Sequence, residues 1–322
     1  TPKPSSAASD VYKRQVPDFV KNGSKEVIEA FLEGYTLGDG HVHVKTGHRS
    51  WYSCSKDLLG DIQDLLLKLG TVGILTQKIE RKTSCFIGSR EIHQRRPQYE
   101  LYERPNKPRS WLDSRDRYVI PYKGKVYCAE VTSHILYVRR NGKPVWCGNT
   151  VIGYTQKSKL ADALLKPLIP YLKEQNYCGY VDIACIIDEK TGVPYPLEFT
   201  CYDDQTEVLT EEGWKYFKDV EIGEKVASLN PNTNIAEYHL VQEVIQKPFN
   251  GDMIHFKSDS HASDLLVTPD HSMWAKKNKG NYKFVTAQEI FDNPHGWSVK
   301  RSANFMGCLL YTSPSPRDVE ES

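Results

Sequence analysis

The sequence contains no apolar run approaching the ~18–20 residues that a membrane-spanning helix needs. It also lacks the basic segment followed by an apolar one that marks a secretory signal. None of its eight cysteines forms a C-x-x-C pair, and no Cys/His cluster has the spacing of a zinc site. These absences exclude a membrane protein and a disulfide scaffold. We therefore expect a cytoplasmic protein in a reducing compartment.

Large net charge is absent too, since the 322 residues sum to +1, but the local balance is uneven. Between Thr76 and Lys125, thirteen Lys and Arg face six Asp and Glu, and aromatic residues are interleaved with them. A DNA backbone favours such a basic stripe, although a solvated surface would have the same composition. If the stripe binds DNA, the predicted contacts are Lys78, Arg81, Lys82, Arg90, Arg95, Arg96, Arg104 and Arg109.

Two helices are predicted near the start of the chain. Ser24 can cap the first, whose apolar residues recur at helical spacing and which ends at Gly38-Asp39-Gly40. Ser55 opens the second, and Gly70 ends it. Stretches typical of β-strands lie between and after the two helices.

Residues 31–40 (FLEGYTLGDG) resemble the motif of the LAGLIDADG homing endonucleases, and residues 55–70 resemble the second helix of that αββ repeat. In that family, two motif helices pack through small residues, and each presents one acid that binds Mg²⁺. The resemblance implies that Asp39 is a catalytic metal ligand and that the partner is double-stranded DNA. Only one motif is visible, so the partner acid lies outside this sequence or never existed.

Residues 126–149 predict two alternating strands around an Asn-Gly turn, a β-hairpin. The segment resembles the C-terminal splicing region of an intein. That resemblance implies that Asn149 cyclises and breaks the 149–150 bond, that Thr150 is the downstream nucleophile, and that His134 promotes the step by proton transfer. One departure is Gly148, since inteins usually carry His before the terminal Asn.

Residues 150–200 predict a helix followed by two strands, a fragment too small to bury its own core. They resemble the metal-binding end of an ATP-grasp ligase, nearest to phosphoribosylamine–glycine ligases of purine synthesis. The resemblance implies that Glu198 and Asp182 hold Mg²⁺ on ATP. Cys201 interrupts the pattern just after the strand.

Residues 201–306 predict short strands with frequent turns, an all-β module. They resemble the N-terminal part of an intein, the Hint fold, on Cys201 and the T-x-x-H block formed by Thr268 and His271. The resemblance implies that Cys201 attacks the carbonyl of Thr200, while Thr268 and His271 polarise and protonate the amide.

The expected fold class is a multi-module α+β chain: a LAGLIDADG αββ repeat (16–125), Hint splicing segments (126–149 and 201–306) and a small αββ ATP-grasp fragment (150–200) between them. Residues 1–15 and 307–322 resemble translated sequencing adapters, and we interpret them as artefactual or disordered tails. The implied partners are DNA and the missing segments of both inteins and of their host. If the two intein segments complement each other, Thr150 could attack the thioester at Thr200 and cyclise residues 150–200.

Three alternatives remain open. The chain could be a DNA-binding homing endonuclease with inert splicing blocks, or a ligase fragment that uses Mg²⁺ and ATP. A Hedgehog-like autoprocessing domain also starts with Cys and T-x-x-H, but it has no counterpart of the terminal Asn149.

Overall fold

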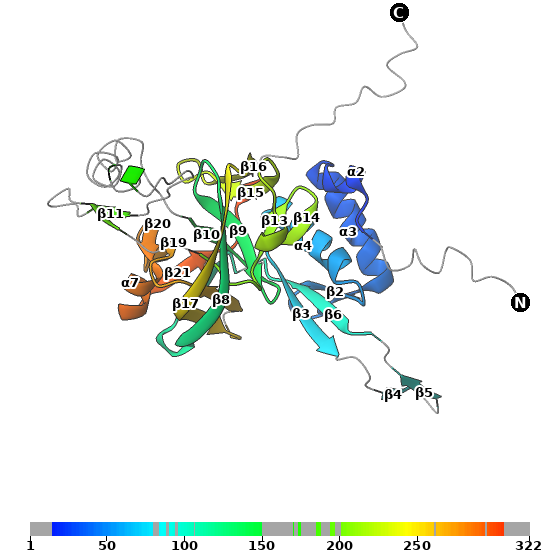
Figure 1. Cartoon of the computed structure of the whole chain (residues 1–322). Helices are drawn as coiled ribbons and strands as arrows, with labels where there is room; N and C mark the ends of the chain where they lie inside the picture. Colours follow the sequence, from blue (N-terminus) through cyan, green and yellow to red (C-terminus); the bar gives the residue numbers. More distant parts are fainter. Residues whose placement is uncertain are drawn as a thin grey trace, which may run out of the picture.

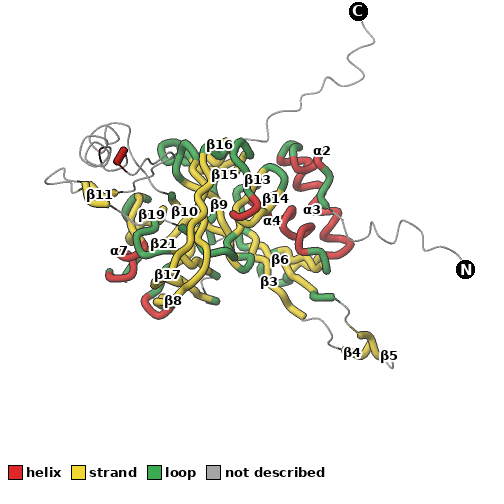
Figure 2. Tube along the Cα trace, in the orientation of Figure 1, coloured by secondary structure: helices red, strands yellow, loops and turns green. Residues whose placement is uncertain are grey.

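The computed structural model describes residues 15–79, 84–87, 90–93, 96–105, 107–149, 201–260, 262–293 and 295–305, with residues 170, 173, 174, 185–187 and 194–196 between them. Two units are seen in Figure 1: an N-terminal unit (residues 15–105) and a strand unit (residues 107–149 and 201–305). The fold is mixed α/β with few helices and many strands, and Figure 2 shows α2, α3 and α4 gathered on the N-terminal unit. No helix in the described part is long and apolar enough to span a membrane.

The two predicted helices of the N-terminal unit are confirmed. A short helix α2 (Asp18–Lys21) precedes α3 (Lys25–Asp39), which ends where the Gly40 N–H donates to the Thr36 carbonyl. Helix α4 (Lys56–Lys68) starts where the Ser55 hydroxyl accepts a hydrogen bond from the Leu58 N–H. It is followed by Gly70 at a φ of +79°, which a glycine adopts without strain.

The helices cover one face of a four-stranded antiparallel sheet in the order β1-β2-β6-β3. Trp51, Leu75 and Leu101 are buried in one hydrophobic cluster with residues of α3 and α4. The strands are β1 (Gly40–Val42), β2 (Arg49–Ser53), β3 (Gly73–Ile79) and β6 (Gln98–Glu103), with a separate hairpin of β4 (Ser84–Ile87) and β5 (Arg90–His93).

The strand unit contains three sheets, and most of its hydrophobic side chains share one core. Their orders are β10-β9-β13-β15-β16-β22 with β14 on β13, β18-β17-β8, and β20-β19-β21-β7. The elements before residue 150 are β7 (Arg109–Trp111), β8 (Arg117–Glu130), β9 (Ile135–Arg140) and β10 (Lys143–Gly148). Those after residue 200 are β13 (Glu207–Thr210), β14 (Gly213–Tyr216), β15 (Lys225–Leu229), β16 (Ile235–Leu240), β17 (Glu243–Ser258), β18 (Ser263–Val267), β19 (Ser272–Lys277), β20 (Lys283–Thr286), α7 (Ala287–Asp292), β21 (Trp297–Lys300) and β22 (Asn304–Phe305). Between them, β11 (Cys185–Ile187) pairs with β12 (Pro194–Pro196).

The predicted hairpin is confirmed as β9 and β10. Its turn residues Asn141 and Gly142 have φ values of +49° and +74°, as a two-residue turn with positive φ at both positions requires. The hairpin also joins the two units, because the Gly142 carbonyl accepts from the Leu75 N–H and from the Gln63 side chain.

The segments on either side of residues 150–200 fold together. Strand β8 pairs with β17 from Arg117↔Phe256 to Glu130↔Glu243, and β9 pairs with both β13 and β15. The sequence predicts a module boundary after residue 125 and assigns residues 126–149 and 201–306 to two different inteins. In the structure, residues 109–111 pair with β21 as strand β7 and residues 117–125 form the first part of β8, so this stretch belongs to the strand unit.

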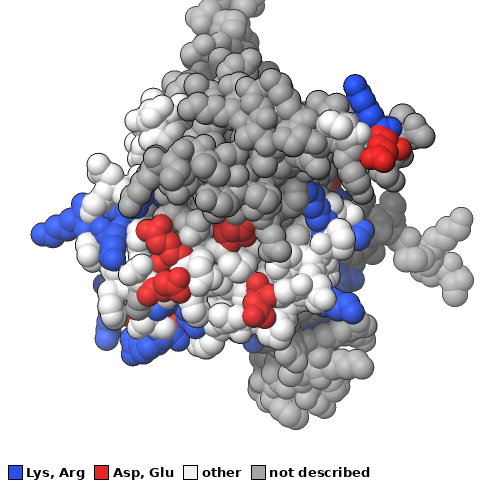
Figure 3. Space-filling view, turned by 60° about the vertical axis from the view of Figure 1, so that its left-hand side comes forward, with Lys and Arg blue, Asp and Glu red and all other residues white. Residues whose placement is uncertain are grey.

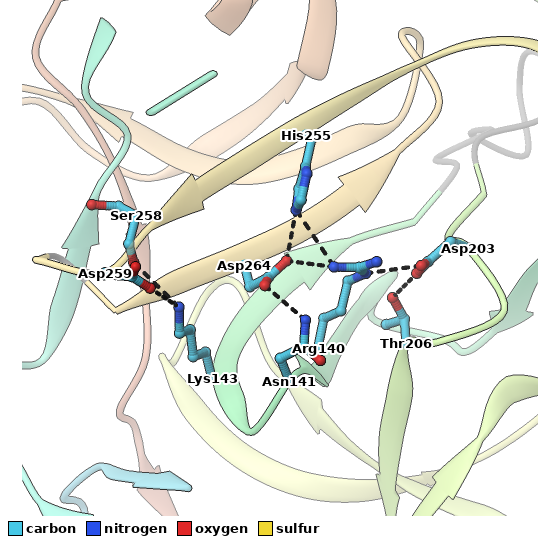
Figure 4. A network of polar contacts seen from close by, with 9 residues as sticks. All are labelled: Arg140, Asn141, Lys143, Asp203, Thr206, His255, Ser258, Asp259 and Asp264. Carbon is cyan, nitrogen blue, oxygen red and sulfur yellow. Dashed lines mark hydrogen bonds and ion pairs between the residues drawn. The ribbon is translucent and has the colours of Figure 1, made fainter. Parts of the chain in front are cut away.

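A buried polar network also joins the two segments (Figure 4). The Arg140 guanidinium donates to Asp203 and to Asp264, each at 2.8 Å. Asp264 also bonds Asn141 at 2.9 Å and His255 Nε2 at 2.8 Å. The sequence places neither His255 nor His261 in a motif, and both are predicted to lie on the surface. This prediction is wrong for His255, which packs over the Asp264 carboxylate and is 8% exposed. His261 lies outside the described residues.

We expect Asp264→Asn to lower the free energy of unfolding by about 3 kcal/mol at pH 7, because it removes one charge of a buried ion cluster. Burial alone would raise the pKa of Asp264, but hydrogen bonds from His255, Asn141 and Arg140 lower this pKa to about 2. The stabilisation is fully present above about pH 4, the pKa of an aspartate in the unfolded chain, and it is lost as the pH falls toward 2.

Urea unfolding at pH 7 and at pH 3 measures both effects. The matched control is Asp259→Asn, whose carboxylate pairs with Lys143 at 2.9 Å but is 91% exposed, so its loss should cost under about 1 kcal/mol. Equal losses in the two variants would contradict the role assigned to Asp264.

Candidate functional site

Asn149 follows strand β10 and is fully buried, with both ends of its side chain held. Its Nδ2 donates to the Ala129 carbonyl at 2.6 Å, and its Oδ1 accepts from the Cys128 thiol at 3.0 Å. Its backbone N–H donates to the His134 carbonyl at 2.7 Å. Three strand and turn residues thus fix the orientation of this amide.

Cys201 is clamped by Thr268, which follows strand β18. The Cys201 N–H donates to the Thr268 hydroxyl at 3.1 Å, and the Thr268 N–H donates to the Cys201 carbonyl at 3.1 Å. This N–H belongs to the 200–201 peptide bond, so the hydroxyl contacts the amide that the resemblance to inteins implies it polarises. Both residues are fully buried.

Tyr202 connects the surroundings of Asn149 with those of Cys201. Its backbone pairs with Tyr127 through two hydrogen bonds of 2.8 and 2.9 Å, and its hydroxyl donates to the Gly148 carbonyl at 3.1 Å. The edge of the His271 ring lies against the Tyr202 ring, with centroids 4.4 Å apart. His271 Nε2 is also 3.4 Å from the Cys147 thiol. The 149–150 and 200–201 peptide bonds therefore adjoin one buried site. We call it the junction site, and its residues are Cys128, His134, Cys147, Gly148, Asn149, Cys201, Tyr202, Thr268 and His271.

Burial keeps the three thiols of the site protonated. It raises the pKa of Cys201 to about 12, with a further contribution from the charge of Asp270, and it raises the pKa of Cys147 to about 12. The pKa of Cys128 lies well above its ordinary value for the same reason. Cys128 is therefore a hydrogen-bond donor to Asn149, and Cys201 must lose a proton before it can act as a nucleophile.

His134 adopts a φ of +56°, in the left-handed region that glycine and asparagine tolerate better than other residues. The turn is held because the His134 N–H donates to the Val131 carbonyl while its own carbonyl accepts from Asn149. Backbone strain of this kind costs about 1–3 kcal/mol and is concentrated at functional sites.

Gly148 has a physical reason for departing from the histidine of the family pattern. A Cβ at this position would lie 2.4 Å from the Ser272 carbonyl oxygen and 2.9 Å from the Phe284 ring. No side chain fits there without moving strand β19 or β20.

Asp39 lies at the exposed end of α3. The described residues include no group of three His, Cys, Asp or Glu that could hold a metal ion. Mg²⁺ can be held by one carboxylate only together with oxygens from elsewhere, such as nucleic-acid phosphates. No DNA-cutting step follows from Asp39 alone.

The predicted DNA contacts are divided between the two units. Lys78 pairs with Glu100 at 2.7 Å on the N-terminal unit, and Arg104 lies over the Tyr102 ring at 5.1 Å. Arg109 lies over Trp111 at 5.0 Å on the strand unit, and Arg96 is exposed. The other predicted site residues lie outside the described part of the chain: Arg81, Lys82, Arg95, Thr150, Asp182 and Glu198, together with the side chain of Arg90.

Sequence reasoning missed Cys128 and Tyr202, and it assigned Cys147 no contact with His271. Cys128 sits in an apolar alternating strand, where a thiol is expected to be a small core residue. Only the position of Asn149 beside β8 distinguishes it. Tyr202 could have been suspected as a site residue only because it directly follows the predicted nucleophile Cys201.

Comparisons with known proteins cover parts of the chain. The model of a LAGLIDADG-like domain matches residues 26–104. An ATP-dependent Clp protease proteolytic subunit of Chlamydomonas moewusii is 35% identical over 95 residues, which is 28% of this chain and 9% of that protein. A DNA-directed RNA polymerase subunit beta C-terminal section of Stigeoclonium helveticum is 35% identical over 108 residues, 31% of this chain and 10% of that protein.

An uncharacterized protein of Methanocaldococcus jannaschii is 23% identical over 137 residues, 42% of this chain and 15% of that protein. The chain therefore spans only 9–15% of the length of these relatives. No solved structure matches it.

We expect Gly148→Ala to destabilise the protein by about 2 kcal/mol, because the added methyl group would overlap the Ser272 carbonyl. Thermal unfolding measures the loss. Gly34→Ala is the control, since its Cβ would meet nothing within 4 Å and alanine favours the helix by up to about 1 kcal/mol. A neutral Gly148→Ala would contradict the close packing described for this site.

Proposed function

We propose that this chain, which carries a LAGLIDADG-like homing endonuclease module that implies DNA binding, processes its own backbone after Asn149 and before Cys201. The observation that carries the proposal is the hydrogen bond from Tyr202 next to one junction to Gly148 next to the other. Self-processing requires both reacting residues to be held in one water-poor site, and both Asn149 and Cys201 are fully buried.

The first reaction is an N-to-S acyl shift. The Cys201 sulfur attacks the carbonyl carbon of Thr200, the 200–201 C–N bond breaks, and the thiol proton ends on the Cys201 amine. The Thr268 hydroxyl, 3.1 Å from the Cys201 nitrogen, orients that amide. The product is a thioester that holds residues 1–200 on Cys201.

The second reaction cyclises Asn149. Its Nδ2 attacks its own carbonyl carbon, the 149–150 bond breaks, and the Thr150 amine leaves with a proton while residue 149 becomes a succinimide. A thiol that donates to Oδ1 and a carbonyl that accepts from Nδ2 both favour the nucleophilic form of the amide, which supports a positioning role for Cys128. No water is consumed in either step.

The order of the segments decides the fate of residues 150–200. Attack of the Thr150 hydroxyl on the thioester, release by Asn149 and an O-to-N acyl shift would join Thr150 to Thr200. That sequence yields a cyclic peptide, residues 1–149, and a chain that begins with Cys201. Hydrolysis of the thioester would give the linear peptide instead, heavier by one water.

The small fraction of each relative that matches this chain is consistent with an inserted element. About one hundred matching residues in a protease subunit and in a polymerase section, each about a tenth of the relative, fit an insertion carried by unrelated hosts. The host here is proposed to be a purine-synthesis ATP-grasp ligase, with Glu198 and Asp182 on Mg²⁺ and ATP. Thermal stabilisation by Mg²⁺ with ATP tests that proposal.

We expect the purified 322-residue chain to break at 149/150 and, faster with dithiothreitol, at 200/201, as followed by intact mass over hours. Asn149→Ala should abolish the first break and Cys201→Ala the second. The matched controls are Asn232→Ala and Cys54→Ala, because both residues are exposed and outside the site. An unchanged mass would leave DNA binding as the function of the chain.

We expect His134→Gly and His134→Asn to slow cleavage at 149/150 at least tenfold without lowering the melting temperature, because both residues tolerate the positive φ but lack the imidazole. Mass spectrometry and thermal unfolding give the two readouts. Cleavage at the parent rate in both variants would show that the His134 imidazole does not take part in the reaction.

A further inference from the structure

A cavity of about 740 Å³ lies where the N-terminal unit meets the strand unit, away from the buried junction site. We name it the basic pocket, after the six cationic residues that line it: Arg104, Lys107, Arg109, Lys276, Lys300 and Arg301. None of the described residues that line it is acidic. On the face drawn in Figure 3, acidic side chains lie across the middle and basic ones mainly toward the edges, so positive charge is not general on the surface.

The sheet β20-β19-β21-β7 brings these cations together at a cost. Lys300 on β21 lies directly opposite Arg109 on β7, and Lys276 on β19 lies opposite Ser298, two residues before Lys300. Residues two apart share a face, so three cations project from one side of the sheet. Like charges directly opposite on a sheet are destabilising, which is unexpected for a purely structural arrangement.

The burial of two of the cations adds to this cost. Lys300 is 8% exposed and Arg301 is 1% exposed. Burial and the charge of Lys276 lower the pKa of Lys300 to about 8, and burial and the charge of Arg104 lower the pKa of Arg301 to about 10. The Lys300 ammonium donates to the Asn234 side chain, and the Arg301 guanidinium donates to the Ala262 carbonyl; both of these acceptors are uncharged.

Two aromatic rings flank the cations. Arg109 lies 5.0 Å from the Trp111 ring centroid, and Lys276 lies 5.0 Å from that of Tyr282. The rings orient the cations through cation–π contacts, yet they supply no counter-charge. An anion with several negative oxygens would fit the cavity and offset the repulsion.

The basic pocket adjoins the sheet of the N-terminal unit. A second cavity, of about 680 Å³, is lined by His41, His43 and Tyr52 of that unit, and it shares Arg104, Lys107 and Ser260 with the basic pocket. Glu100 and Glu103 also line this second cavity, where they pair with Lys78 and Arg49. A polyanion that lies on the sheet can therefore reach the pocket through the shared cations Arg104 and Lys107.

We propose that the basic pocket binds the sugar–phosphate backbone of double-stranded DNA held by the LAGLIDADG-like domain, so that the strand unit extends the DNA-binding surface. The proposal rests on the DNA-binding part of the proposed function and is independent of self-processing. The pocket contacts phosphates, so it raises affinity without reading sequence.

The test uses the full chain with Asn149→Ala and Cys201→Ala, which keep it intact, and a duplex of random sequence. Binding is measured by fluorescence anisotropy between 50 and 200 mM salt, with the thermal stability of each protein without DNA. The pocket variant is Lys276→Gln with Lys300→Gln. The control is Lys123→Gln with Lys125→Gln, two exposed lysines of β8 that remove the same charge outside the pocket.

We expect the pocket variant to bind about tenfold or more weakly at 50 mM salt and to flatten the slope of log affinity against log salt by about 1–2, one unit for each lost phosphate contact. Its melting temperature without DNA should rise or stay unchanged, because two mutually repelling charges have been removed, whereas a merely structural role of Lys300 would give a lower melting temperature. The control should lose less than threefold.

Two results would overturn the proposal in distinguishable ways. If the pocket variant binds the duplex with the same affinity and the same salt slope, the pocket does not contact DNA, but DNA binding by the LAGLIDADG-like domain still stands. If the parent protein binds no duplex at 50 mM salt, both the pocket and DNA binding by this chain are rejected.

Discussion

The pairing of β8 with β17 is the constraint on which the rest of the structure depends. Its register, from Arg117↔Phe256 to Glu130↔Glu243, holds the segment before residue 150 against the segment after residue 200. Cys128 and Ala129 lie in this ladder and hold the Asn149 side chain, while Tyr202 pairs with Tyr127 beside them. A shift by one residue would turn each of these side chains to the opposite face.

Ion pairs also hold the segment before residue 150 against the segment after residue 200. Arg139 on β9 donates to Glu207 and to Gln63 of helix α4, and Arg140 joins Asp203 and Asp264. Buried ion pairs add little net stability when compared with apolar packing, but leaving one partner alone is costly. They therefore favour the one arrangement in which all partners meet. In that arrangement the two units and both segments are fixed together.

The two surfaces of functional interest have opposite characters. The junction site is buried and apolar, and it raises the pKa values of its thiols, as a reaction that must exclude water requires. The basic pocket is open and positively charged, which suits a polyanion. Because the two share none of the residues that the structure describes, processing and DNA binding can be altered separately.

The sequence alone determined the elements that depend on local signals: helix α3, helix α4 after its Ser55 cap, and the β9–β10 hairpin at Asn141-Gly142. The resemblance of residues 126–149 and 201–306 to intein segments also predicted roles for His134, Asn149, Cys201, Thr268 and His271. Only the tertiary structure decided that Cys128 contacts Asn149, that Gly148 has no room for a side chain, and that Lys300 faces Arg109. Each of these depends on the register between strands far apart in the chain, which no local propensity encodes.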